Sequence, residues 1–207
     1  LALFKKENIG LGKIVRGEKT ETPLAFVVIH KKTGHRTSFY TTGAFPNISP
    51  EAFSDALDTR TTHLLIDGHN RRVALDFIRK ARQQETQVFL DLGNPKHGME
   101  QLVEQSHVII APQAYWSIVW PNQQPEAIIR HLLTTGPELV VLTMEEKGCF
   151  VGQKKTVFHQ PSLPVQAVDT NGAGDVFFGA FTYGILQNWP MQKTAEFACA
   201  AAAQSCT

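Results

Sequence analysis

A short glycine-rich segment dominates this sequence: Asp169-Thr170-Asn171-Gly172-Ala173-Gly174-Asp175, followed directly by an apolar run at residues 176–181. Thr170 and Asn171 are residue types that cap helices, and glycines let the backbone turn tightly and approach a ligand. The run after Asp175 is apolar on every face, which predicts a buried helix. The first turn of such a helix presents free N–H groups and the positive end of the helix dipole, so we expect it to bind a phosphate.

Asp175 lies in the first turn of this expected helix. A carboxylate there is favourable for the helix dipole, but it would repel a phosphate. We therefore expect Asp175 to face a second, protic substrate beside the anion. The alternative is a plain capped helix with a glycine turn, which a bare Gly-x-Gly would favour; the seven-residue string is much more specific.

This string resembles the D-T-x-G-A-G-D signature of the ribokinase family of sugar kinases, also called the phosphofructokinase-B family. The resemblance implies that the backbone of Gly172, Ala173 and Gly174 forms an anion hole and that Asp175 is the catalytic base. It also implies an α/β fold, a ribokinase-like three-layer αβα sandwich with a mostly parallel central sheet and a small β-sheet lid.

Composition agrees with a single globular domain. The 207 residues suffice for a substantial core, and 43% hydrophobic with 19% charged residues is ordinary for an enzyme. Lys and Arg total 20 against 19 acidic residues, so the formal charge of +1 gives no electrostatic argument for nucleic acid or an anionic membrane. No apolar run approaches the roughly 20 residues that span a bilayer.

Three cysteines, Cys149, Cys199 and Cys206, are too few and too scattered for a disulfide framework, which favours a reducing cytoplasm. The chain opens in the middle of a pattern without an initiator Met and closes inside an alanine-rich helical run. We therefore expect the kinase domain at 1–207 to be incomplete at both ends. A targeting segment outside this sequence stays open.

Residues 13–42 have a pattern of their own. Three short strand-like runs lie there, at 13–17, 24–30 and 36–41, with a turn at Lys32-Thr33-Gly34. The middle run is apolar throughout at 25–29, which predicts that both of its faces are covered. The segment is either an ordinary edge hairpin or a small sheet set apart from the main fold. The resemblance favours the second, because the family carries here a β-sheet lid that closes over the sugar and often mediates dimerisation.

From residue 63 onward, buried strands alternate with helical patterns. Strands are expected at 64–66, 88–90, 108–110 and 139–142, helices at 73–81, 99–103 and 125–133, and a small hairpin at 150–158. This alternation predicts a parallel sheet with helices on both faces. Such sheets bind ligands beyond the carboxyl ends of their strands.

Two of these strands end in polar residues. The stretch Asp67-Gly68-His69-Asn70 follows the first strand. It is either a polar loop with a turn glycine or part of a binding site. In the family this loop lines the sugar pocket, so the resemblance implies substrate binding by Asp67, His69 and Asn70, together with Asp175.

The second strand ends in Asp91-Leu92-Gly93-Asn94, which matches the family's D-x-x-N pattern. We expect Asp91 and Asn94 to face the active-site cleft. A small-residue helix at 197–203 predicts tight helix packing; in the family it also backs the adenine pocket.

One departure from the family lies after the third strand, where Ala111-Pro112-Gln113-Ala114-Tyr115-Trp116 stands in place of N-x-x-E. The Glu of that motif helps to organise Mg²⁺ through water. Gln113 and Trp116 occupy its two positions. We still expect turnover to need Mg²⁺, with Glu145, Glu146 or Asp91 holding metal-bound water.

A second departure is Thr143-Met144-Glu145-Glu146-Lys147-Gly148, at the place of T-L-G-x-x-G near the ATP phosphates. Thr143 and Gly148 match, whereas Glu145 replaces the first glycine. The resemblance implies ATP binding by Thr143, Glu145, Lys147 and Gly148, and by Thr170. Both departures, and the Pro46-Asn47-Ile48 segment, are similar to the ketohexokinase branch of the family.

The resemblance thus implies an ATP-dependent kinase that phosphorylates a sugar of ketose or pentose type and uses Mg²⁺. A homodimer formed through the lid is an open corollary. The alternatives are a catalytically impaired nucleotide or sugar sensor on the same fold and a nucleoside kinase of the same family. The eight histidines show no metal-binding spacing, and no P-loop motif is present, so neither a zinc site nor a P-loop enzyme is predicted.

Overall fold

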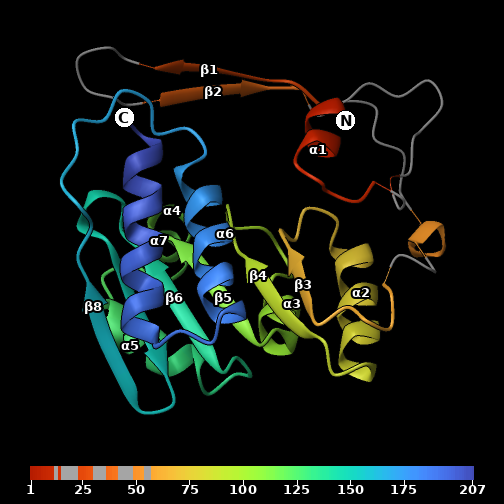
Figure 1. Cartoon of the computed structure of the whole chain (residues 1–207). Helices are drawn as coiled ribbons and strands as arrows, with labels where there is room; N and C mark the ends of the chain where they lie inside the picture. The colour runs from red at the N-terminus through yellow and green to blue at the C-terminus, as the bar shows by residue number, and fades with distance from the viewer. Residues whose placement is uncertain (12–13, 15–22, 30–35, 42–48, 54–56) are drawn as a thin grey trace.

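The computed structural model describes residues 1–11, 14, 23–29, 36–41, 49–53 and 57–207. After the short helix α1 (Ala2–Lys6), the described strands form two separate sheets, one of two strands and one of six. Figure 1 shows the small sheet at the end of the molecule where helix α6 begins. None of the helices in the described ranges has both the length and the apolar character that crossing a bilayer requires.

The six-stranded sheet follows chain order. Its strands are β3 (His63–Ile66), β4 (Gln87–Asp91), β5 (Val108–Pro112), β6 (Leu139–Thr143), β7 (Cys149–Gln153) and β8 (Thr156–Gln160). The first four are parallel, and β7 and β8 are antiparallel to their neighbours. The carboxyl ends of β3 to β6 therefore meet at one edge, as the sequence predicts.

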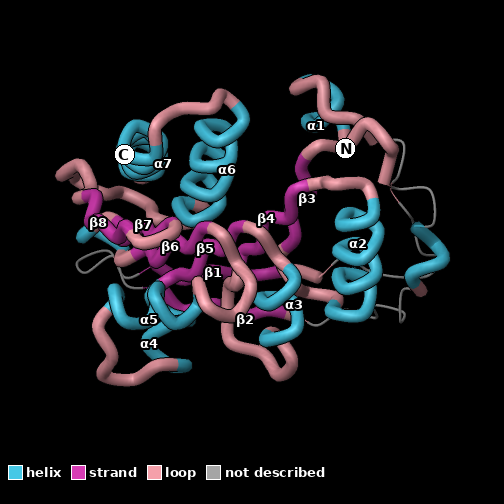
Figure 2. Tube along the Cα trace, turned by 90° about the horizontal axis from the view of Figure 1, so that it is seen from below, coloured by secondary structure: helices cyan, strands magenta, loops and turns pink. Residues whose placement is uncertain are grey.

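Helices cover both faces of this sheet. They are α2 (Arg71–Gln83), α3 (Glu100–Gln105), α4 (Gln113–Val119), α5 (Pro125–Leu132), α6 (Ala173–Leu186) and α7 (Met191–Ser205), with short 3-10 turns η1 (Pro50–Phe53) and η2 (Glu145–Lys147). In Figure 2, α2 to α5 lie on one side of the sheet and α6 and α7 on the other. This confirms the expected three-layer αβα sandwich.

The period-two alternation of the strands divides the core in the same way. On β4, Val88 and Leu90 pack with the helices α2 to α5, whereas Phe89 packs with α6 and α7. All three side chains are completely buried. Strands that bury both faces need apolar residues at every position, which explains the continuous apolar runs in the sequence.

Helices α6 and α7 pack closely through small residues. A Cβ atom at Gly184 would lie 2.7 Å from Thr194 Cγ2, so only glycine fits this contact without a shift. Ala195, Ala198 and Cys199 of α7 are buried in the core beneath. This confirms the tight helix packing expected for the small-residue run.

The expectation that α6 is buried on every face is wrong for the described chain. Phe177 and Phe181 pack on the sheet, but Val176, Tyr183 and Leu186 are exposed. The sheet and α7 cover only part of the circumference of α6, and no described residue covers the rest.

The small sheet pairs β1 (Ala25–Ile29) with β2 (Arg36–Tyr40) in antiparallel register. Neither strand pairs with the six-stranded sheet, which confirms a small sheet apart from the main one. The expectation that both faces of β1 are covered is wrong within the described residues, since Phe26 is 70% exposed. The predicted turn at 32–34, the strand at 13–17 apart from Ile14, and the Pro46-Asn47-Ile48 segment lie outside the described residues.

Candidate active site

The glycine-rich segment forms a tight turn into α6. The helix begins at Ala173, and its N-cap is Gly172 at φ +80°, a left-handed conformation that glycine adopts without strain. The side chain that closes the turn is that of Asp169, whose Oδ1 accepts a hydrogen bond of 2.8 Å from Asn171 N. The expectation that Thr170 and Asn171 cap the helix is therefore corrected, because the cap position belongs to Gly172, which has no side chain to accept a hydrogen bond.

The end of α7 anchors the start of this turn. The carbonyl oxygen of Cys206 accepts hydrogen bonds from Val168 N at 2.7 Å and from Asp169 N at 3.2 Å. Because α7 packs along α6, one helix pair fixes both ends of the turn. The anion-binding geometry thus has a rigid support.

Backbone donors are available in the first turn of α6. Val176 N bonds to Gly172 O at 2.9 Å, and Ala173 N makes a longer bond of 3.3 Å to Thr170 O. The N–H groups of Gly174 and Asp175 find no acceptor within the described part of the chain. A Cβ at Gly174 would meet nothing within 4 Å, so the space beside these donors is open to a ligand.

A cavity of about 450 Å³ opens beside this turn. Its walls are largely apolar and come from β3, α2 and α6; the apolar lining is Leu64, Leu65, Ile66, Val73, Ala74, Phe77 and Phe178. Four polar residues complete the lining: Asp67, Asn70, Asp91 and Asp175. A mainly apolar cavity with a few convergent polar groups is the usual form of a small-molecule site.

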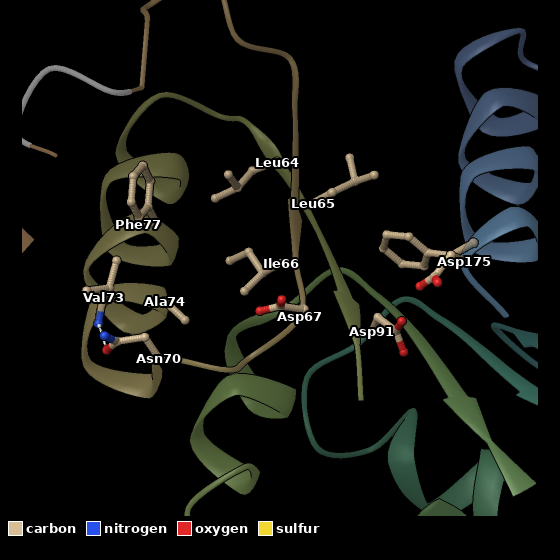
Figure 3. A pocket seen from close by; sticks show the side chains of 11 residues that line it. Leu64, Leu65, Ile66, Asp67, Asn70, Val73, Ala74, Phe77, Asp91 and Asp175 are labelled. Carbon is tan, nitrogen blue, oxygen red and sulfur yellow. Dashed lines mark hydrogen bonds between the residues drawn. The ribbon is translucent and has the colours of Figure 1, made fainter. Parts of the chain in front are cut away.

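The polar residues reach this cavity from three separate elements, as Figure 3 shows. The carboxylates of Asp91 and Asp175 approach the same space from β4 and α6, whereas Asp67 lies nearer to α2. Asn70 caps α2, because its Oδ1 accepts a bond of 3.3 Å from Val73 N. The structure therefore brings together the ends of β3 and β4 and the start of α6.

Two of the predicted polar residues do not line the cavity themselves. His69 contacts it only through Asp67, since its Nδ1 lies 3.2 Å from Asp67 Oδ2 and its N–H donates to Asp67 Oδ1 at 2.9 Å. Asn94 is exposed and is not part of the described lining. Phe178, which sequence reasoning placed only in the helix core, is part of the wall.

Asp91 has an unusual environment for a carboxylate. Its Oδ1 accepts a hydrogen bond of 3.1 Å from Gly93 N. Burial is the largest effect on the pKa of Asp91 and raises it, and the hydrogen bond from Gly93 N opposes burial as the next largest effect. The charges of Asp175 and Asp67 raise this pKa further by smaller amounts, and His69 lowers it slightly. A carboxyl group with this pKa takes up a proton more readily than a free aspartate.

The segment 143–148 begins at the last residue of β6, lies at the same edge of the sheet, and is outside the cavity lining. It closes on itself through Met144 N, which donates to Gly148 O at 2.7 Å. Gly148 has φ +91°, and a Cβ there would lie only 2.1 Å from Gln160 O. Glycine is therefore required at this position, whereas Glu145 adopts a left-handed φ of +53° despite its side chain.

Two side chains hold this segment from outside, and sequence reasoning missed both. Trp116 Nε1 donates to Thr143 O at 3.1 Å, and His159 Nε2 donates to Lys147 O at 2.8 Å. The only signal in the sequence was that Trp116 stands where a Glu is expected. A contact between side chain and backbone over such separations leaves no periodic trace in the sequence.

The described residues contain no group of three or more His, Cys, Asp or Glu side chains that could hold a metal ion alone. Mg²⁺ in phosphoryl-transfer sites typically uses one or two carboxylates, waters and the substrate phosphates instead. Asp91 and Asp175 at the cavity are compatible with that kind of partial ligand set.

Comparison with known proteins covers the whole chain. The family model described as pfkB family carbohydrate kinase matches residues 1–207. The chain is 21% identical to ketohexokinase of Mus musculus, covering 100% of this chain and 73% of that protein. It is 25% identical to ribokinase of Schizosaccharomyces pombe, covering 96% and 66%.

Among solved structures, ribokinase from Thermotoga maritima superposes with a TM-score of 0.77 at 24% identity, covering 100% of this chain and 70% of that one. This likeness supports the fold. The chain therefore spans only part of the length of these relatives, between 66% and 73%.

Proposed function

Because the chain belongs to the pfkB family of carbohydrate kinases, we propose that the protein transfers the γ-phosphate of ATP to a hydroxyl group of a small sugar. The observation that carries this proposal is the position of Asp175. It lies in the first turn of α6, next to backbone N–H groups that have no acceptor among the described residues, and it lines a cavity that also holds Asp67 and Asn70. The backbone N–H groups next to Asp175 thus suit an anion, and the cavity that its carboxylate lines suits a polyol.

In the proposed reaction, an oxygen of the Asp175 carboxylate accepts the proton of the attacking sugar hydroxyl. The hydroxyl oxygen forms the new bond to the γ-phosphorus while the bond to the β-phosphate oxygen breaks and ADP leaves. The N–H groups around Gly172, Ala173 and Gly174 stabilise the negative charge of the transferring group. Ala173 N contributes by giving up its long hydrogen bond to Thr170 O and donating to the transferring phosphoryl group instead.

Substrate recognition is assigned to the polar residues of the cavity. Asp67 and Asn70 bind sugar hydroxyls, and His69 orients the Asp67 carboxylate, from which it lies 3.2 Å away. The apolar wall contacts the carbon skeleton. A ketose or a pentose is proposed, because the similar proteins include a ketohexokinase and a ribokinase.

ATP binding is assigned to Thr143, Glu145, Lys147 and Gly148, together with Thr170. The segment 143–148 lies at the carboxyl edge of the sheet, where α/β sheets bind ligands. Mg²⁺ bound to the triphosphate supplies charge neutralisation. Asp91, Glu145 and Glu146 are the residues that would hold its coordinated waters.

The test is ADP release by the purified protein across a panel of ketoses, pentoses and nucleosides. Turnover with a sugar that stops in excess chelator supports the proposal, and turnover with nucleosides alone indicates a nucleoside kinase instead. If a Glu145→Gln, Glu146→Gln double variant keeps the Mg²⁺ dependence of the parent unchanged, these two residues do not hold the metal-bound water.

A sensor without turnover is the second candidate, favoured by Gln113 and Trp116 at the positions of the family's N-x-x-E. Calorimetry separates the two functions: a sensor binds ATP and sugar without releasing ADP.

We further propose a reducing compartment, since Cys149 Sγ and Cys199 Sγ lie 3.8 Å apart as free thiols. A protein isolated with these two thiols bridged would contradict that assignment.

A further inference from the structure

We infer that Trp116 and His159 are positioning residues that hold the 143–148 segment in its ATP-binding shape through two backbone carbonyl oxygens. This inference rests on the proposed function, because the segment has a ligand only if the protein binds ATP. It goes further by naming two residues of this chain outside the segment that determine its geometry.

The first contact joins α4 to the start of the segment. Pro112 ends β5 and pairs with Thr143 at the end of β6, and proline has no N–H to donate at this edge. Four residues later, the buried indole of Trp116 donates from Nε1 to Thr143 O at 3.1 Å. The position of a buried indole is well defined by its packing, so this donor fixes where the segment leaves the sheet.

The second contact joins β8 to the other end of the segment. His159 lies opposite Phe150 on β7, and their rings are 4.8 Å apart between centroids. Its Nε2 lies 2.8 Å from Lys147 O. A carbonyl oxygen only accepts, so Nε2 carries the hydrogen of this bond, whether the ring is neutral or charged.

The segment continues into β6 and β7 at its two ends, where Thr143 pairs with Cys149, but its internal bonds do not join it to α4 or β8. Lys147 N donates to Met144 O at 3.0 Å, and Gly148 N donates to Glu145 O at 3.1 Å. Glu145 meanwhile occupies the left-handed region, which persists only where the surroundings enforce it. The hydrogen bonds from Trp116 and His159 brace the two ends of the segment from opposite sides.

The two departures from the family pattern are thereby connected. Trp116 replaces the acidic residue of one motif, and Glu145 replaces a glycine of the other. The Trp116–Thr143 bond joins the first motif directly to the second. Trp116 thus supports the triphosphate site through the backbone, at a position where a carboxylate would have acted through water.

The main experiment uses Trp116→Phe, which keeps a buried aromatic ring and removes the indole donor. We expect the KM and the Kd for ATP to rise about fivefold or more, equivalent to about 1 kcal/mol, the usual net value of one hydrogen bond. The sugar KM should stay within twofold, as should kcat. Trp120→Phe is the matched control, since Trp120 follows the same helix and its indole makes no hydrogen bond with the described residues.

His159 is tested by a pair of variants. His159→Phe removes the donor and should raise the Kd for ATP to a similar extent. His159→Gln places an amide N–H near the same position and should restore most of the affinity. Rescue by glutamine separates positioning of the segment from simple loss of the ring contact with Phe150.

The outcomes separate this inference from the proposed function. If the parent protein binds ATP and both donor-less variants bind it equally well, the inference is wrong and the kinase proposal stands. Equal losses of affinity for sugar and for ATP, together with a lower Tm, would also overturn the inference, because that pattern marks a purely structural role. If the parent binds ATP without turnover, the Kd comparison still decides the inference. A parent that does not bind ATP overturns both.

Discussion

Asp91 and Asp175 face one cavity from different elements, and the charge of Asp175 adds to burial in raising the pKa of Asp91. The two carboxylates have different surroundings: Asp175 is exposed at the start of a helix, whereas Asp91 is partly buried at the end of a strand. Groups in such different environments are suited to different tasks in one site.

Asp175→Asn should lower kcat by about 10²-fold or more, because a positioned base typically contributes about 10²–10⁴-fold. The Kd for ATP should hold or fall slightly, since the change removes a negative charge next to the γ-phosphate. Steady-state kinetics and calorimetry on the same preparation measure both effects. A variant that retains more than about a tenth of the parent kcat, a loss of less than about 1.4 kcal/mol, would show that Asp175 is not the base.

Gly174→Ala should leave stability intact and weaken the reaction. A Cβ at this position meets no protein atom within 4 Å, so any clash must involve the ligand. We expect kcat/KM for ATP to fall by about tenfold, with Tm unchanged or slightly higher, since Ala favours helix over Gly by roughly 0.5–1 kcal/mol. Gly179→Ala is the matched control, because it lies on the same helix with equally open space. An equal loss in both variants would argue against an anion site at the helix start.

Asp91→Asn should stabilise the fold at neutral pH. The raised pKa means that the folded protein binds a proton more readily than the unfolded chain, so stability falls as pH rises from the ordinary value of 3.8 through the raised one. Asn has no proton to lose, and its amide oxygen still accepts from Gly93 N.

Thermal unfolding at pH 7 and near pH 4 tests this expectation. The Asp91→Asn variant should exceed the parent at pH 7, by about 2–4 °C in Tm for each kcal/mol gained, and the difference should shrink toward pH 4. Its activity should fall, because Asp91 faces the proposed reacting groups. A variant that is less stable than the parent at pH 7 would show that the Asp91 carboxylate does not destabilise the folded protein.

Phe26→Asp should weaken self-association of the protein. The β1–β2 sheet exposes large apolar side chains, among them Phe26 at 70% and Phe39 at 62%, and such patches commonly mark interfaces. We propose that a second copy covers this sheet, and sedimentation equilibrium at micromolar concentration tests it. Ile118→Asp on α4, where Ile118 is 66% exposed, is the control. A monomeric parent protein would remove the dimer proposal.

Much of the fold was predictable because it depends on local patterns. Continuous apolar runs such as Val88-Phe89-Leu90 mark strands buried on both faces, and strand ends mark the site edge. The order of strands and loops predicts that Asp67 and Asp91 lie at one edge of the sheet, whereas the position of Asp175 at that edge was implied by the family resemblance. The exposed side of α6 could not be predicted, since an apolar surface in the sequence does not reveal what covers it.

Other features depend on contacts between residues far apart in the chain. Gly172 rather than Thr170 became the N-cap because Asp169, held by Cys206 O, closes the preceding turn. The bond from Trp116 to Thr143 spans 27 residues and needs the finished sheet to bring its partners together. No spacing rule encodes either contact.

The strand order of the main sheet, β3-β4-β5-β6-β7-β8, also has a consequence for how the molecule folds. Each strand pairs with the one that precedes it in the chain, so the sheet can grow in chain order without waiting for a more distant strand. The cavity instead needs Asp175 of α6 and Asp67, which follows β3, in one lining, and these two residues lie far apart along the chain. In stopped-flow refolding we expect sheet circular dichroism to return before ATP binding does; simultaneous recovery would show that α6 docks during nucleation.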